Sequence, residues 1–225
     1  MADLVTGRRV AAVLVAAAVA VLGWAATPKS SAPPAVAPAA VSAGTAAAAL
    51  DQLPVKGRAP KTGYSRSQFG KGWSDPDGNG CDARRDVLAR QAVGEPVRRG
   101  KAQCVFTADI VDPYSGTVIP STTADVDHVV ALGDAWVKGA QQLDSTRREA
   151  LANDPLNLLA VAASLNRQKS DSDAASWLPP AKSARCGYVA RQVAVKMRYG
   201  LWVTPAERDA IARVLAGCPG DPLPT

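Results

Sequence analysis

Alternation of apolar and polar positions predicts β-structure in the first part of the folded region. Residues 103–111 alternate and include Val105, Phe106 and Ile110, and residues 117–120 form a second short apolar run. Residues 112–116, between the two runs, contain a proline, which fixes φ, and a glycine, which accepts positive φ, so they predict a turn. The two runs are therefore expected to pair as a hairpin.

A helical period replaces this alternation farther along the chain. Leu132, Ala135, Trp136 and Ala140 recur at the spacing of one helix face. In chain order, the whole pattern predicts a helix over residues 82–91, the hairpin, a helix over 132–139, a short helix over 147–152, a buried strand over 157–161, and a helix that Ser164 caps and that stops before Pro179.

Two further helices are predicted near the end of the chain. Residues 186–199 carry apolar side chains at every fourth position, and Gly200 follows them as a C-cap. Residues 204–207, Thr-Pro-Ala-Glu, form a capping box with proline at the first helical position, so a second helix is expected from there to Ala216. The order of strands and helices predicts an α+β fold with C-terminal flanking helices.

The first of these two helices carries three basic side chains, Arg191, Lys196 and Arg198. We interpret them as a solvated face of a scaffold helix, with contact to substrate phosphate as the alternative. The charge of the chain does not decide between the two. Its formal net charge is +6, and three basic residues and one acidic residue precede residue 51, so the remainder carries +4. A mildly basic domain is compatible with a polyanionic partner but is not a nucleic-acid signature by itself.

Composition divides the chain into three parts. Arg8 and Arg9 precede an uncharged apolar run over residues 10–26, so residues 1–26 are predicted to be a signal peptide, or a membrane anchor if they are not cleaved. Residues 27–50 are rich in Ala and Pro and are predicted to be a linker. Residues 51–225 form the predicted domain, and with 47% hydrophobic residues the chain can bury a core. We expect a secreted or extracellular protein.

The four cysteines fit an oxidising compartment. The spacings between them include no Cys-x-x-Cys, which disfavours a zinc or redox motif; the cysteines are Cys81, Cys104, Cys186 and Cys218. Two disulfides are expected, and three connectivities are possible. We favour Cys81–Cys104 and Cys186–Cys218, because each closes a local loop worth about 3 kcal/mol in the chain-entropy model.

An acidic stretch just before the first predicted helix resembles the start of a calcium loop. Asp75, Asp77 and Asn79 have the spacing of oxygen ligands, and Gly80 would make the sharp turn. The glutamate that such a loop needs would fall at Asp86, inside the predicted helix. An ordinary turn that leads into the helix is therefore the preferred interpretation, and a calcium-stabilised structural protein is the weaker alternative.

Candidate chemistry centres on His128, the single histidine of the chain. Histidine exchanges protons near neutral pH, and Asp127 directly before it can serve as a hard oxygen ligand. Asn157 begins the next predicted strand and Asn166 lies on the following helix. A strand, strand, helix unit can bring the aspartate and the amide to one side of a cation, with the histidine facing a phosphate. This combination suits phosphodiester hydrolysis, in which a base activates water and a divalent metal neutralises the phosphate and stabilises the leaving oxygen.

The residues at these positions resemble a known family. Val-Asp-His-Val-Val at 126–130, Asn-Leu-Leu at 157–159 and Asn-Arg-Gln-Lys-Ser-Asp at 166–171 look like the HNH family of His-Me finger (ββα-metal) nucleases. That family includes the HNH domain of RNA-guided CRISPR effectors. The wider sequence is similar to secreted HNH-type proteins of bacteria, which are related to the C-terminal nuclease domain of GmrSD-type restriction enzymes. The core motif covers residues 125–171.

The resemblance implies a role for each matching residue. His128 would be the general base, Asn157 would orient it, and Asp127 and Asn166 would hold the metal. Mg²⁺ would suit one carboxylate, one amide and several waters, and Mn²⁺ could replace it. Two basic side chains on the same helix, Lys169 and Arg167, are expected at the substrate, and the extra carboxylates Asp125 and Asp171 are expected outside the metal site.

The resemblance predicts an exported, monomeric, metal-dependent endonuclease that hydrolyses DNA, with RNA as the other possible substrate. Two features depart from many members: Ala131 stands where proline often follows the histidine strand, and the last ligand is asparagine rather than histidine. The alternative is a non-catalytic exported module that binds nucleic acid or a protein partner. No groove-reading helix is recognisable, so base specificity is not predicted.

Overall fold

The computed structural model describes residues 44–225. The predicted signal peptide and all but the last residues of the predicted linker lie outside this range. No helix within it has both the length and the apolar character that a membrane crossing requires.

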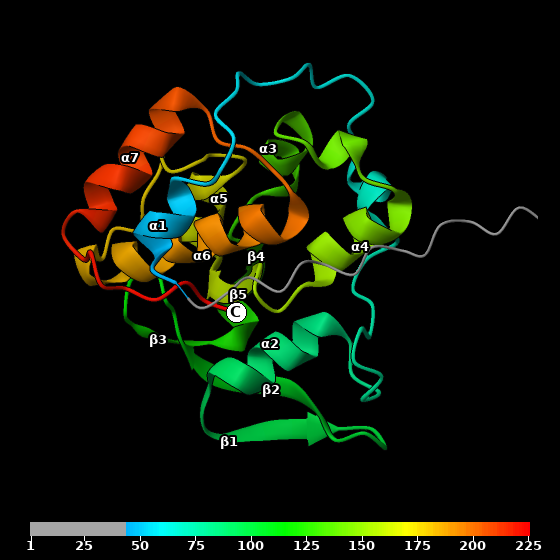
Figure 1. The fold of residues 1–225 in the computed structure, drawn as a ribbon. Coiled ribbons are helices and arrows are strands. Elements are labelled where there is room, and N and C mark those ends of the chain that lie inside the picture. Colours follow the sequence, from blue (N-terminus) through cyan, green and yellow to red (C-terminus); the bar gives the residue numbers. More distant parts are fainter. Residues whose placement is uncertain (1–43) are drawn as a thin grey trace, which may run out of the picture. The chain divides into compact units, whose positions relative to one another are not determined.

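Twelve longer helices and strands and four short 3₁₀ turns make up the described part (Figure 1). In chain order these are α1 (Ala46–Leu50), a 3₁₀ turn (Arg66–Phe69), α2 (Ala83–Gln91), β1 (Ala92–Arg99), β2 (Cys104–Val111), β3 (Val118–Pro120), a 3₁₀ turn (Ser121–Thr123), β4 (Ala124–His128), α3 (Leu132–Val137), a 3₁₀ turn (Ala140–Gln142), α4 (Ser145–Asn153), β5 (Leu158–Ala162), α5 (Ala163–Lys169), a 3₁₀ turn (Lys182–Ala184), α6 (Arg185–Tyr199) and α7 (Pro205–Leu215). The predicted α+β class is confirmed.

The first sheet has the antiparallel strand order β1-β2-β3. The predicted hairpin is its β2–β3 pair, in which Ile110 lies opposite Ile119. β1 was not predicted, because Gly94 and Pro96 interrupt any alternation along it. Its pairing with β2 is irregular on either side of Val97, and Gly94 has a φ of 72°. Glycine adopts this backbone conformation without a Cβ clash.

Helix α2 joins the first sheet to the second, the antiparallel pair β4–β5 (Figure 1). Its N-cap Asp82 accepts the Arg85 N–H, and its buried residues Val87 and Leu88 pack against both sheets. The core there also contains Ile110 from β2 and Leu158 from β5. The helix therefore fixes the position of one sheet relative to the other.

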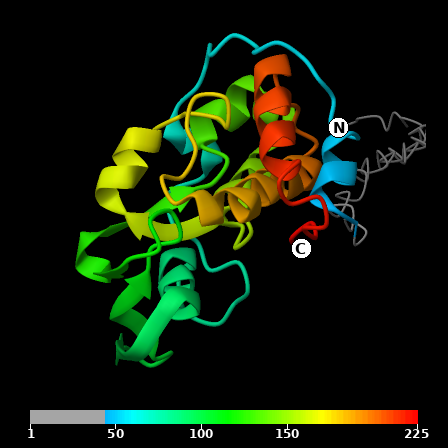
Figure 2. The ribbon, with the colours of Figure 1, turned by 90° about the vertical axis from the view of Figure 1, so that its left-hand side faces the viewer.

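A larger core surrounds α6, with α1 and α7 packed on it beside the C-terminal segment (Figure 2). α6 ends at Gly200 in the left-handed conformation, and α7 begins with the capping box of Thr204 and Glu207, both as predicted. α1 corrects the predicted start of the domain: Ala46 and Leu50 are buried in this core, so the fold begins before residue 51. The alanine-rich composition concealed a short helix.

The basic side chains of α6 correct another prediction. Lys196 is completely buried and pairs with Asp134 and Glu207, at 3.5 and 3.0 Å. Arg198 pairs with Asp154, and Arg191 donates to the Leu156 carbonyl. These three side chains hold the fold together and form neither a solvated face nor a phosphate-binding face.

Both favoured disulfides are present, Cys81–Cys104 and Cys186–Cys218. The first ties the start of α2 to β2. The acidic stretch before it is an ordinary turn: the carboxylates of Asp75 and Asp77 accept the backbone N–H of Asn79, and Asp75 also accepts that of Gly80.

Replacing the apolar anchor of α1 tests the corrected boundary. Leu50→Ala should lower the free energy of unfolding by about 2–5 kcal/mol, because it opens a cavity at a side chain that is 3% exposed. Gln52→Ala, at an exposed position two residues later, should change it by less than about 0.5 kcal/mol. Urea titrations measure both. Equal effects of the two substitutions would show that α1 is not part of the folded core.

Candidate functional site

Strands β4 and β5 with helix α5 bring the predicted site residues into one region. His128 lies opposite Leu158 and Asp127 opposite Leu159 in the antiparallel pair. Successive side chains of a strand point to opposite faces of the sheet, so neighbouring residues of β4 lie on different faces. Val126 and His128 point away from α5, whereas Asp127 points toward it and meets Lys169. The base and the predicted metal ligand are therefore on opposite faces of β4.

His128 is held in one orientation by its surroundings. Its Nε2 lies 2.9 Å from the Ala152 carbonyl oxygen. A carbonyl only accepts hydrogen bonds, so in the neutral ring Nε2 carries the proton and Nδ1 keeps its lone pair. The Trp73 ring stacks on the imidazole, with 5.7 Å between the ring centroids and 14° between the planes. The side chain is therefore fixed in the tautomer in which Nδ1 accepts a proton.

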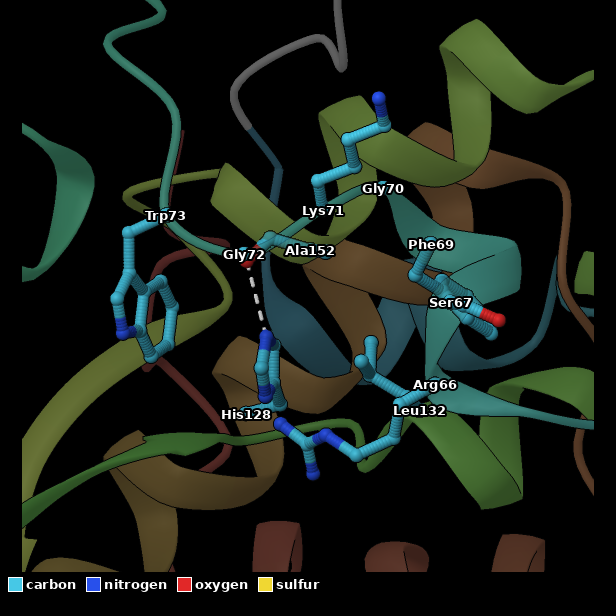
Figure 3. Close-up of a pocket in the computed structure, with 10 residues that line it drawn as sticks. All are labelled: Arg66, Ser67, Phe69, Gly70, Lys71, Gly72, Trp73, His128, Leu132 and Ala152. Atoms are coloured by element: carbon cyan, nitrogen blue, oxygen red, sulfur yellow. Dashed lines mark hydrogen bonds between the residues drawn. The ribbon is translucent and has the colours of Figure 1, made fainter.

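The imidazole faces a pocket of about 380 Å³, which Figure 3 shows in close-up. Seven residues between Arg66 and Trp73 line it, together with Leu132 and Ala152. Arg66 lines this pocket together with His128, whereas the Lys71 side chain extends away from the imidazole (Figure 3). A neutral base and a cation that line the same pocket form an arrangement that suits an anionic ligand.

Burial, together with the charges of Arg66 and Lys169, lowers the pKa of His128 to about 4. The hydrogen bond to the Ala152 carbonyl acts in the opposite direction. The ring is consequently neutral at physiological pH and able to accept a proton.

Asn157 is completely buried and contacts the backbone that follows His128. Its Oδ1 accepts the Val130 N–H at 2.8 Å, and its Nδ2 donates to the carbonyls of Val130 and Leu151. The Asn157 backbone carbonyl accepts the Val129 N–H. The asparagine thus joins the segment after His128 to the end of α4, where Ala152 contacts the imidazole.

Asp127 takes part in a buried charged cluster. Its Oδ1 lies 3.0 Å from Lys169 Nζ, and its Oδ2 accepts the Tyr114 hydroxyl at 2.5 Å. Lys169 is completely buried and also donates to the His128 carbonyl at 2.8 Å. Burial raises the pKa of Asp127, and the contacts with Lys169 and Tyr114 counteract part of that rise. Burial also raises the pKa of Tyr114 well above its usual value.

These contacts do not fit a metal ion held between Asp127 and Asn166. Both carboxylate oxygens of Asp127 already have protein partners, and one partner is an ammonium, which repels a cation. The Asn166 amide instead donates to Asp125, at 3.3 Å. Asn166 is half-buried, and its side chain contacts Asp125 rather than Asp127.

The two basic residues that were expected at the substrate are separated. Lys169 is interior, which corrects the expectation of a phosphate contact, and Arg167 is exposed on α5. Asp171 pairs with Lys61 at the surface, outside the expected metal site.

Sequence reasoning missed three residues of the site: Arg66, Trp73 and Tyr114. Arg66 and Trp73 lie more than 50 residues before His128 in a stretch without periodicity, so only the fold brings them to it. Tyr114 belongs to the predicted turn after β2, and nothing in its sequence context distinguishes a buried hydroxyl from an exposed one.

Removing the buried ammonium tests whether Lys169 is structural. Lys169→Met should lower the free energy of unfolding by about 3–5 kcal/mol at pH 7, because it leaves the Asp127 carboxylate buried without its partner. The deficit should shrink toward pH 4, where the unpaired carboxyl group takes up a proton and loses its charge. Arg167→Met, on the same helix but exposed, is the matched control. Chemical denaturation at both pH values gives the comparison, and a similar small loss for both variants would contradict this role.

Comparison with known proteins identifies the domain. Residues 82–214 match the family model described as "GmrSD restriction endonucleases, C-terminal domain". An "Uncharacterized secreted protein" of Arthroderma benhamiae is 37% identical over 204 residues, which cover 89% of this chain and 98% of that protein. No solved structure matches. The matched range contains the whole β4, β5 and α5 unit, and the chain belongs to the family of GmrSD restriction endonuclease C-terminal domains.

Proposed function

We propose that this protein is an exported HNH-type endonuclease that hydrolyses phosphodiester bonds of DNA, with His128 as general base. One observation carries the proposal: the single histidine lines a pocket beside Arg66, with one ring nitrogen engaged by a backbone carbonyl. Membership of a nuclease family makes nucleic acid the substrate class. Within that class, DNA rather than RNA is the proposal that the resemblance to HNH nucleases supports.

The proposed reaction begins with a phosphodiester anion in the pocket, held by the Arg66 guanidinium. His128 Nδ1 takes a proton from a water molecule, and the resulting hydroxide attacks phosphorus. The bond from phosphorus to the leaving oxygen breaks, and that oxygen takes a proton from solvent. Trp73 and the Ala152 carbonyl keep the imidazole in place during the attack.

A base with a pKa of about 4 is weak at neutral pH. A bound phosphate changes this, because a nearby negative charge favours the protonated imidazole and raises its pKa. The anion also offsets the charge of Arg66, one of the causes of the lowered value. Substrate binding itself would therefore bring the base closer to the working pH.

The divalent ion is a separate part of the proposal. The resemblance to metal-dependent nucleases implies Mg²⁺, and Mn²⁺ could replace it. The contacts of Asp127 give no support to its role as a ligand, so we assign no step to the ion. Export is proposed from the apolar segment at residues 10–26, from the disulfides, and from the name of the fungal relative.

His128→Ala should abolish cleavage of supercoiled DNA, with a loss of at least about 100-fold, because it removes the base. Added imidazole should restore part of the activity, because removal of the histidine side chain creates a cavity that opens into the pocket. Circular dichroism and thermal unfolding would verify that the variant folds. Single-stranded DNA and RNA, assayed in parallel, would define the substrate. Undiminished cleavage by the folded variant would exclude His128 as the base.

Chelation should stop the cleavage, and added Mg²⁺ should restore it. The temperature of unfolding should stay unchanged in chelator, because the carboxylates of the described core pair with protein groups. Plasmid nicking and a thermal scan on the same samples separate the two effects. Full activity in chelator would contradict the proposed metal dependence.

A further inference from the structure

We propose that a second surface, remote from the pocket of His128, binds a nucleic-acid strand. A groove of about 270 Å³ lies between α2, β2 and the turn that precedes β4. We name it the α2–β2 groove. Its lining consists of Arg84, Arg85, Leu88, Val105, Phe106, Thr107, Ser121 and Thr122. The inference rests on the proposed function in taking nucleic acid as the ligand.

The groove is cationic. Arg84 and Arg85 belong to the first turn of α2, and no carboxylate of residues 44–225 lines the groove. Arg85 pairs with Asp82, whereas Arg84 has no ion-pair partner among residues 44–225. The unpaired guanidinium of Arg84 is free to contact a phosphate oxygen, whereas that of Arg85 would have to leave or share Asp82.

An exposed aromatic ring supplies the second element of nucleic-acid recognition. Phe106 is 45% exposed, although it belongs to the central strand of its sheet. The guanidinium of Arg99 lies over this ring, 3.9 Å from its centroid. Rings beside cations are stacking platforms for unpaired bases, and Arg adds a cation–π contribution.

Two hydroxyl groups complete the polar lining. Thr107 is half-buried and Thr122 is exposed. Ser121 is buried, and its Oγ accepts the Ala108 N–H, so it belongs to the scaffold. Cations, hydroxyls and a partly exposed ring together match a strand with phosphates and planar bases better than an acidic peptide, which carries no base to stack.

The groove and the pocket are linked by one strand. The turn Ser121–Thr123 leads directly into β4, which ends at His128. Five residues of strand span about 17 Å, comparable to about five base steps of B-form DNA. A substrate that engages both sites must therefore be longer than a few nucleotides, and short fragments are expected to bind less tightly.

The experiment compares two double variants with equal loss of charge, each in the full chain that also carries His128→Ala so that the probe is not cut. Arg84→Gln with Arg85→Gln removes the groove cations, and Arg208→Gln with Arg213→Gln removes two from α7. Fluorescein-labelled single-stranded DNA of 30 nucleotides is the probe, and fluorescence anisotropy at several salt concentrations gives Kd. Phe106→Leu is the second test, because it removes the ring but keeps an apolar side chain.

The groove double variant should raise Kd about tenfold or more and reduce the slope of log K against log salt by about 1.4, since single-stranded DNA contributes about 0.7 for each phosphate contact. Phe106→Leu should raise Kd at least about fivefold. The α7 double variant should stay within about twofold of the parent. The proposal that the α2–β2 groove binds DNA is overturned if both double variants weaken DNA binding equally. It is also overturned if the groove variants do not weaken DNA binding at all.

The same experiment separates the groove from the catalytic proposal. If the groove variants bind weakly while wild type and His128→Ala cut DNA equally, the groove stands and the assignment of the base fails. If cleavage depends on His128 but the groove variants bind like the parent, the proposed function stands and the groove fails.

Discussion

The buried ammonium of Lys169 is the contact on which the geometry around His128 depends. It joins the last residue of α5 to the Asp127 carboxylate and to the His128 carbonyl, at 3.0 and 2.8 Å. Removing a charge from water is costly unless it is paired and hydrogen-bonded, so this ion pair is stable in one arrangement only. That arrangement fixes α5 against β4 and sets the backbone from which the imidazole projects. The ion pair of Lys169 and Asp127 on one face of β4 thus positions the imidazole of His128 on the other face.

The larger core uses buried charge in the same way. Lys138 contacts three carboxylates at 2.6 to 2.7 Å, and Lys196 contacts two of them. The carboxylates belong to Asp134, Asp173 and Glu207, and Arg58 closes the cluster at the surface. Burial alone would raise the pKa of Asp173, but Lys138 and Arg58 lower it to about 2. Because the three carboxylates come from α3, α7 and the segment after α5, the network fixes how those parts pack, and each carboxylate is paired with at least one buried ammonium.

Much of the architecture was predictable from periodicity and capping signals, including α2, the β2–β3 hairpin, β5, α6, α7 and both disulfides. The errors concern burial and distance. A lysine has the same sequence signature whether it is exposed or paired in the interior, so the roles of Lys169 and Lys196 were misjudged. α1 was concealed by alanine-rich composition and β1 by Gly94 and Pro96. Arg66 and Trp73 reach His128 only through the fold, which local patterns do not encode.

The alternation of side chains along β4 limits what the site can do. Asp127 and His128 are adjacent in sequence, yet one meets Lys169 and the other meets Trp73. A cation beside Asp127 would have to displace a buried ammonium, and the resulting unpaired charge would cost several kcal/mol. The pocket of His128 needs no such exchange, because Arg66 already supplies a positive charge there. The electrostatics therefore favour an anion on the histidine face and disfavour a second cation on the aspartate face, unless α5 moves away from β4.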